Sequence, residues 1–172
     1  MLISLNDIPG EGLDIALKDE DFDLGTEEGL VTSLDPVEFE VHLDRIGQNV
    51  LASGHLSTTV GLTCSRCLRV FSLKIEEDFR VVYQRKERTL EGEHELMAGE
   101  LDVEFLEGDE IDVNNLIREN ILLGLPLQPL CIENCQGLCP KCGQNLNEGQ
   151  CQCIRQGEDP RFQILKMLLK DT

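Results

Sequence analysis

Eight cysteines constrain the fold of this chain more than any other feature of its sequence. Six of them lie in the stretch CIENCQGLCPKCGQNLNEGQCQC, near the end of the chain, and the other two lie in CSRC. They form four close pairs: Cys64 with Cys67, Cys131 with Cys135, Cys139 with Cys142, and Cys151 with Cys153. A structural zinc ion takes four ligands, commonly from two short pairs that the fold brings together. The four pairs therefore predict two Cys₄ zinc sites.

The strongest local signal is CPKCG, which runs from Cys139 to Gly143. Two residues between the thiols let both face one ion from a tight turn, and the following glycine can adopt a positive φ. We expect Cys151 and Cys153 to complete this site, because the intervening GQNLNEGQ consists mostly of turn formers.

The remaining pair, Cys131 and Cys135, would then share the other site with Cys64 and Cys67. That site would tie the start of the cysteine-rich segment to the strand expected after Cys67. Spacing alone does not fix which pairs meet in space, so other groupings of the pairs stay open.

The cysteine-rich segment has too few apolar residues to fold on its own. Between Cys131 and Glu158 the apolar side chains, cysteines and one proline aside, are Ile132, Leu138, Leu146 and Ile154. Ordering the backbone costs about 1 to 2 kcal/mol per residue, whereas a structural zinc site in a small peptide supplies on the order of 10 to 16 kcal/mol. We expect this segment to need its ions.

Three other roles for the thiols are less consistent with the sequence. A redox C-x-x-C usually lies at a strand-to-helix turn, but a strand pattern follows Cys67. An iron–sulfur cluster also uses four thiolates, but the familiar ferredoxin spacings are absent. Disulfides need an oxidising compartment, and nothing in the sequence indicates one.

The chain is strongly acidic, with 33 Asp and Glu against 15 Lys and Arg in 172 residues and a formal net charge of −18. Such a charge repels free nucleic acid as a whole, because affinity for phosphates depends on Lys and Arg. It favours a basic partner, although it also serves solubility. The acids concentrate in residues 1–28 and 85–112, whereas five bases accompany four acids from Cys139 onward.

The N-terminal residues lack a basic start followed by an apolar run, and no stretch approaches about 18 uninterrupted apolar residues. We therefore expect a soluble, cytoplasmic protein without a membrane partner.

Alternation of apolar and polar residues predicts three consecutive strands. The positions on one face are Val37, Phe39, Val41 and Leu43, then Leu56, Thr58, Val60 and Leu62, then Phe71, Leu73, Ile75, Phe79, Val81 and Tyr83. The third pattern fits one long strand or two strands that join near Glu77. Short connections favour an antiparallel meander. Residues 84–100 resemble a polar connection, and residues 101–108 a possible further strand.

Two helices are expected after the strands. Apolar residues recur at helical spacing from Val113 to Ile121, with Asp112 as a cap and Gly124 as a stop. Near the end of the chain, Asp159 is suited to cap a second helix.

The patterns together predict an α+β fold. An antiparallel β-meander core would carry a packed helix, a cysteine-rich zinc-binding appendage and a C-terminal helix. The corresponding segments are a core domain with an acidic N-terminal segment (1–130), the zinc-binding segment (131–158) and the C-terminal helix (159–172).

No group of residues predicts catalysis. His42, His55 and His94 are expected to be solvated side chains rather than ligands or bases. Four cysteines per ion leave no open metal position for water, which argues against a hydrolase. We expect a protein that is not an enzyme and has no small-molecule substrate.

The segments CSRCL, LPLQPLC, CQGLCPKCGQNLNEGQCQC and DPRF, in this order, resemble the YceD family of large ribosomal RNA subunit accumulation proteins. The resemblance covers about residues 30–170 and is most specific at GLCPKCGQNLN. It implies a bacterial or plastid protein associated with accumulation of large-subunit ribosomal RNA. Genes of the family commonly neighbour that of a small ribosomal protein of the same subunit.

Carried over to this chain, the resemblance concerns the eight cysteines, and it brings no catalytic residue. Some members of the family lack the last cysteines but keep the first C-x-x-C, which fits two separable sites.

We therefore predict a zinc-binding factor in ribosome biogenesis. Its acidic body would hold a basic ribosomal protein or a pre-ribosomal particle. Basic residues near the metal sites would contact ribosomal RNA; these are Arg66, Arg69, Lys141, Arg155 and Arg161. The alternatives are a zinc-stapled protein-interaction adaptor unrelated to ribosomes and a thiol redox switch.

Overall fold

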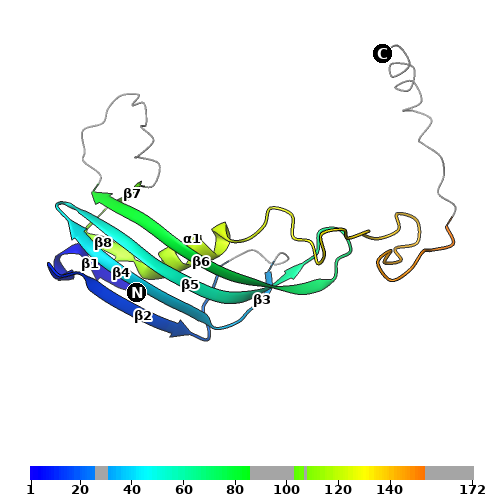
Figure 1. Ribbon diagram of the computed structural model, residues 1–172, viewed down its shortest axis with the longest axis horizontal. Helices are drawn as coiled ribbons and strands as arrows, with labels where there is room; N and C mark the ends of the chain where they lie inside the picture. The colour runs from blue at the N-terminus through cyan, green and yellow to red at the C-terminus, as the bar shows by residue number, and fades with distance from the viewer. Residues whose placement is uncertain (26–30, 86–102, 107, 154–172) are drawn as a thin grey trace, which may run out of the picture. The chain divides into compact units, whose positions relative to one another are not determined.

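The computed structural model describes residues 1–25, 31–85, 103–106 and 108–153 (Figure 1). The chain divides into two compact units. The first, a β-sheet unit, consists of Met1–Ser65 and Arg69–Cys131, and the second consists of Arg66–Leu68 and the residues from Ile132 onward. None of the helices in the described ranges has the length and apolarity that a membrane crossing requires.

The β-sheet unit contains a six-stranded sheet in the order β2-β4-β5-β6-β7, with β3 also paired to β5. Its strands are β2 (Leu13–Asp19), β3 (Val31–Leu34), β4 (Val37–Ile46), β5 (Asn49–Thr63), β6 (Val70–Arg85) and β7 (Val103–Leu106). A second sheet pairs β1 (Leu2–Ser4) with β8 (Glu110–Asp112). A 3-10 helix, η1 (Leu5–Asp7), follows β1, and an α-helix, α1 (Val113–Leu123), follows β8.

The predicted antiparallel meander is confirmed in β4, β5 and β6. In β4, the side chains predicted to share one face are buried, while those between them are exposed or half-buried. β6 is one strand of 16 residues. It pairs with β5 without a register shift from Val50↔Tyr83 to Thr63↔Val70, so no break occurs at Glu77.

The structure is richer in β-strands than the sequence indicated. Part of the acidic N-terminal segment forms β2, which pairs with β4 from Leu13↔Leu43 to Asp19↔Val37. The expected strand within residues 101–108 is β7, and it pairs with β6 in parallel. The start of the expected connection, Gln84 and Arg85, belongs to β6. The part of that connection from residue 86 onward lies outside the described residues.

The helix α1 forms where its spacing predicted. Asp112 accepts a hydrogen bond from the Asn114 backbone N–H at 3.0 Å and caps the start, and Gly124 follows the last turn. The apolar stripe of α1 packs into the core against side chains of the sheet. Within that core the rings of Phe39 and Phe79 stack with centroids 5.3 Å apart. The C-terminal helix predicted for residues 159–172 lies outside the described residues.

Candidate metal centres

The cysteine sulfurs gather into two groups of four. The first cluster contains Cys64, Cys67, Cys131 and Cys135, and the second contains Cys139, Cys142, Cys151 and Cys153. In each cluster all four sulfurs lie within 4.8 Å of one another. This is the grouping that the spacing favoured, and none of the eight cysteines is joined in a disulfide.

The two clusters differ in exposure. In the first cluster three cysteines are buried and Cys131 is half-buried. In the second, Cys139 is buried, Cys142 is exposed, and Cys151 and Cys153 are half-buried. The second cluster is therefore the more open to solvent.

The two C-x-x-C pairs adopt the same local turn. The Cys64 N–H donates to the Arg69 carbonyl at 2.9 Å, and the Cys139 N–H donates to the Gln144 carbonyl at 2.8 Å. Both bonds span five residues. The residue after the second cysteine has a positive φ in each turn, 58° for Leu68 and 73° for Gly143. Glycine was expected at such a position, and the leucine was not recognised as its counterpart.

Hydrogen bonds favour a thiolate at Cys139. The backbone N–H groups of Cys142 and Lys141 donate toward its sulfur and lower the pKa of this thiol to about 6. The Lys141 bond measures 3.4 Å. The Cys142 side chain, by contrast, raises the pKa of Cys153 through a hydrogen bond, and burial adds to this effect. Four thiolates at this separation repel one another, so a bound cation would favour their joint ionisation.

The donor sets fit single zinc ions. Tetrahedral coordination with Zn–S bonds of about 2.3 Å places the sulfurs roughly 3.8 Å apart, which is compatible with both clusters. A multi-iron cluster would hold four thiolates farther apart, because its iron and sulfide atoms lie between them. When bound, each zinc ion would cross-link four points of the chain. Within the described ranges, no other set of three or more His, Cys, Asp or Glu side chains is arranged to hold a metal.

Asn147 supports the first cluster from outside its ligand set. Its Nδ2 donates to the Cys135 sulfur at 3.3 Å. Its Oδ1 accepts from the Gln136 backbone N–H at 2.8 Å. Sequence reasoning treated Asn147 only as a turn former, and its place 12 residues after Cys135 gave no local signal.

Arg66, which we expected to face RNA, has a structural contact. Its Nη1 donates to the Cys135 carbonyl at 3.0 Å. The Arg66 side chain therefore helps to hold the backbone of Cys135, a member of the first cluster. Arg155 and Arg161 lie outside the described residues.

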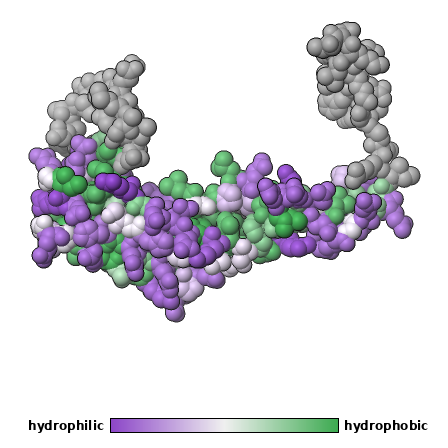
Figure 2. All heavy atoms as spheres, viewed as in Figure 1, coloured by the Kyte–Doolittle hydropathy of each residue, from purple (hydrophilic) through white to green (hydrophobic). Residues whose placement is uncertain are grey.

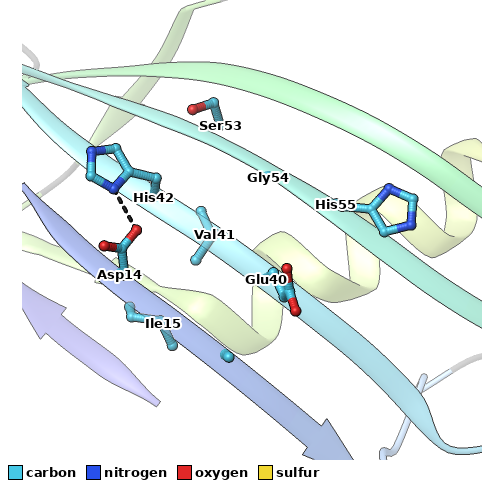
Figure 3. A pocket seen from close by; sticks show the side chains of 9 residues that line it. Asp14, Ile15, Glu40, Val41, His42, Ser53, Gly54 and His55 are labelled. Carbon is cyan, nitrogen blue, oxygen red and sulfur yellow. Dashed lines mark hydrogen bonds and ion pairs between the residues drawn. The ribbon is translucent and has the colours of Figure 1, made fainter.

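A shallow depression of about 510 Å³ lies on the sheet and is lined by residues of β2, β4 and β5 (Figure 3). His42 Nδ1 lies 2.6 Å from Asp14 Oδ1, and His42 Nε2 lies 3.2 Å from Asp44 Oδ1. The bond with Asp14 raises the pKa of His42. His55 Nδ1 lies 2.7 Å from Asp78 Oδ1.

His42 and His55 are ion-paired with carboxylates, which the sequence did not predict, and the expectation that they are neither ligands nor bases stays a prediction. His94 lies outside the described residues. The two rings are 36% and 43% exposed, and both nitrogens of His42 have carboxylate partners. The depression therefore offers no assembled metal site.

Comparison with known proteins relates the part of the chain that contains the cysteine clusters to a protein family. The sequence model described as "Large ribosomal RNA subunit accumulation protein YceD" matches residues 52–169. A protein of Zea mays named "Large ribosomal RNA subunit accumulation protein YCED homolog 1, chloroplastic" is 30% identical over 162 residues, covering 76% of this chain and 55% of that protein. Its Arabidopsis thaliana counterpart is 38% identical over 53 residues, or 31% of this chain and 16% of that protein.

An uncharacterised protein of Mycobacterium tuberculosis is 23% identical over 107 residues, covering 62% of this chain and 50% of that protein. The chain thus spans about half or less of the length of these relatives. No solved structure matches it. The family match covers more than half of the chain and includes every cysteine of both clusters. The chain belongs to the YceD family, whose name implies a role in accumulation of the large ribosomal RNA subunit.

Proposed function

We propose that the protein is a non-enzymatic zinc-binding factor that supports accumulation of large-subunit ribosomal RNA. It would do so by binding a basic ribosomal protein or a pre-ribosomal particle. The observation that carries this proposal is the family match over residues 52–169, which includes both cysteine clusters.

The two cysteine clusters support a structural role for bound zinc. Each cluster offers four thiols to one ion, which fills a tetrahedral zinc site and leaves no position for a reacting water. Zinc bound in this way stabilises a segment that has few apolar residues. Such closed sites are consistent with an adaptor protein. They are not consistent with a zinc hydrolase, because a hydrolase needs an open coordination position for water.

The acidic charge on the face of the sheet opposite the core favours a basic partner. Register places six acidic residues on this face: Asp14, Glu38, Glu40, Asp44, Glu76 and Asp78. Lys18, Lys74 and Arg80 share the face, and Lys18 and Lys74 are ion-paired to two of these acids. Hydrophilic side chains are frequent over the sheet in the visible surface (Figure 2). An acidic surface attracts a basic protein more readily than free RNA.

The contact of Arg66 changes how RNA binding should be tested. Charge reversal at Arg66 would disturb Cys135, so a loss of binding would not identify an RNA contact. Arg69 and Lys141 are exposed and lie beside the two C-x-x-C turns. Reversal of each of these two residues separately probes an RNA contact, provided that the variant keeps the zinc content of the wild type.

The test is affinity purification of the tagged full chain from growing cells, with both protein and RNA identified. We expect large-subunit ribosomal proteins and large-subunit rRNA to be enriched over their small-subunit counterparts. Depletion of the protein should lower large-subunit rRNA more than small-subunit rRNA. Equal recovery of both subunits, together with unchanged rRNA levels on depletion, would refute the proposal.

Charge-reversed variants locate the partner surface. Glu40→Lys combined with Asp78→Lys should reduce recovery of the basic partner, because it places positive charge on the acidic face. The control is Glu11→Lys with Asp21→Lys, which changes net charge by the same amount at exposed positions outside the strands. If both pairs reduce recovery equally, the acidic face is not the docking surface and net charge alone explains the effect.

A further inference from the structure

Asn147 lies between cysteines of the second cluster in the sequence, but its side chain contacts a cysteine of the first cluster. It lies between Cys142 and Cys151, so the two halves of the second cluster flank it. Its side-chain amide nevertheless donates to Cys135, a member of the first cluster, at 3.3 Å. The same amide accepts the Gln136 N–H at 2.8 Å and so also holds the backbone next to Cys135.

Further hydrogen bonds hold Asn147 in this position. Asn145 Oδ1 accepts both from the Asn147 backbone N–H, at 3.0 Å, and from Asn147 Nδ2, at 2.7 Å. The Leu146 N–H donates to the Gly137 carbonyl at 2.9 Å, and Leu138 and Asn145 form an isolated β-bridge. The stretch between Cys142 and Cys151 is thus hydrogen-bonded to the residues directly after Cys135.

We propose that Asn147 is a positioning residue that couples the two clusters, so that metal at the second cluster raises the metal affinity of the first. This inference rests on the proposed zinc binding, and it is independent of the role in ribosomal RNA accumulation. Metal at Cys139, Cys142, Cys151 and Cys153 fixes both ends of the stretch that carries Asn147. The ordered amide then holds Cys135 in place for its own ion.

The effect has two physical sources. An N–H donor stabilises a thiolate, and groups of this kind outside the ligand set change metal affinity by about 10-fold to 100-fold. Ordering the stretch around Asn147 also costs conformational entropy. If an ion at the second cluster has already ordered this stretch, the ion that binds the first cluster does not bear the entropy cost. Zinc binding at the two clusters is then positively cooperative.

The test measures the Zn²⁺ affinity of the first cluster in the full-length chain, by competition with a chromophoric chelator under reducing conditions. Four proteins form a cycle. They are the wild type, Asn147→Ala, a variant with the second cluster disabled by Cys151→Ser and Cys153→Ser, and the combination of both changes. Gln150→Ala is the matched control, because Gln150 is exposed in the same stretch.

We expect Asn147→Ala to weaken the first cluster by about 10-fold, and disabling the second cluster to weaken it by a similar factor. The combined variant should be no weaker than the disabled one, because both changes remove the same support. Gln150→Ala should stay within about twofold of the wild type. Effects of the two changes that multiply in the combined variant would overturn the coupling, as would full affinity in Asn147→Ala.

Two further measurements separate positioning from a general loss of structure. Asn147→Asp keeps an acceptor for the Gln136 N–H but replaces the donor toward Cys135 with a negative charge. We expect it to weaken the first cluster at least as much as Asn147→Ala does. With the first cluster disabled by Cys64→Ser and Cys67→Ser, Asn147→Ala should leave the second cluster's Zn²⁺ affinity unchanged. A loss there equal to that at the first cluster would show that Asn147 only maintains the fold of the segment.

The outcomes also distinguish this inference from the proposed metal binding. If the wild type binds no Zn²⁺ at either cluster, the zinc proposal fails, and the coupling fails with it. If it binds two ions with affinities that do not depend on Asn147 or on each other, the zinc proposal stands and the coupling alone is refuted.

Discussion

At the scale of single residues, the type of residue that directly follows each C-x-x-C pair decides whether the backbone there is strained. Leu68 and Gly143 occupy the same position in the two turns and both have a positive φ. A leucine in this region carries a cost on the order of 1 kcal/mol that glycine avoids. Leu68 is 63% exposed, so its side chain gives little burial in return.

Opposite substitutions at these two positions should therefore act in opposite directions. We expect Leu68→Gly to slow zinc loss from the first cluster, because it relieves backbone strain worth up to about 1 kcal/mol. The greater flexibility of glycine in the unfolded chain offsets part of this gain in stability. Gly143→Ala should increase the rate of zinc loss from the second cluster by a factor similar to the decrease at the first. Zinc transfer to a chelator, followed over time, measures both, and faster loss from Leu68→Gly would contradict the argument.

The ion pair of His42 makes stability depend on pH. The bond with Asp14 raises the pKa of His42 above its ordinary 6.5. The stabilisation is therefore fully present below about pH 6.5 and is lost as the pH rises through the higher pKa of the folded state. Asp14→Asn should lower stability toward urea more at pH 6 than at pH 9. Glu11→Gln serves as the exposed control, and a loss for Asp14→Asn that is the same at both pH values would count against this account.

At the scale of elements, long runs of alternating apolar residues predicted the central strands, and helical spacing predicted α1. β4 buries its inward face from Val37 to Leu43, and α1 buries one stripe, whereas the inward face of β6 is partly buried and includes the exposed Glu77. β2 was missed because it is only seven residues long, lies at the edge of the sheet and belongs to an acidic segment, so that Ile15 and Leu17 give a weaker signal than the 16-residue β6. The direction of β7 could not be predicted, since parallel pairing depends on the path of the chain rather than on side-chain alternation.

Gly54 in the middle of β5 fixes how closely the central strands and their side chains pack. A Cβ atom there would lie 2.1 Å from the Glu40 carbonyl oxygen and 2.7 Å from the Phe79 ring. Gly54→Ala should therefore cost about 1 to 3 kcal/mol or more, as overpacking of a core does. Gly10→Ala, at a position with no atom within 4 Å of the added carbon, should be close to neutral. Urea unfolding of both variants checks this, and equal stability would show that the strands separate without cost.

At the scale of the whole molecule, one chain carries two clusters of thiols and an acidic sheet face. The four close cysteine pairs and their match to two tetrahedral ions were predictable from sequence, whereas spacing only favoured the grouping of pairs that the structure shows. The support around them could not be predicted: the Asn147 amide reaches Cys135 across 12 residues, and Arg66 reaches the Cys135 carbonyl across 69. Such contacts depend on the folded path of the chain.

The metal content of the full chain, purified anaerobically, tests the central claim most directly. Elemental analysis and native mass spectrometry should find two zinc ions per chain in the wild type. Cys64→Ser should retain one, because it removes a ligand from the first cluster and leaves the second intact. Iron with inorganic sulfide and a visible absorption band, or a wild-type chain that holds no more zinc than Cys64→Ser, would contradict the account.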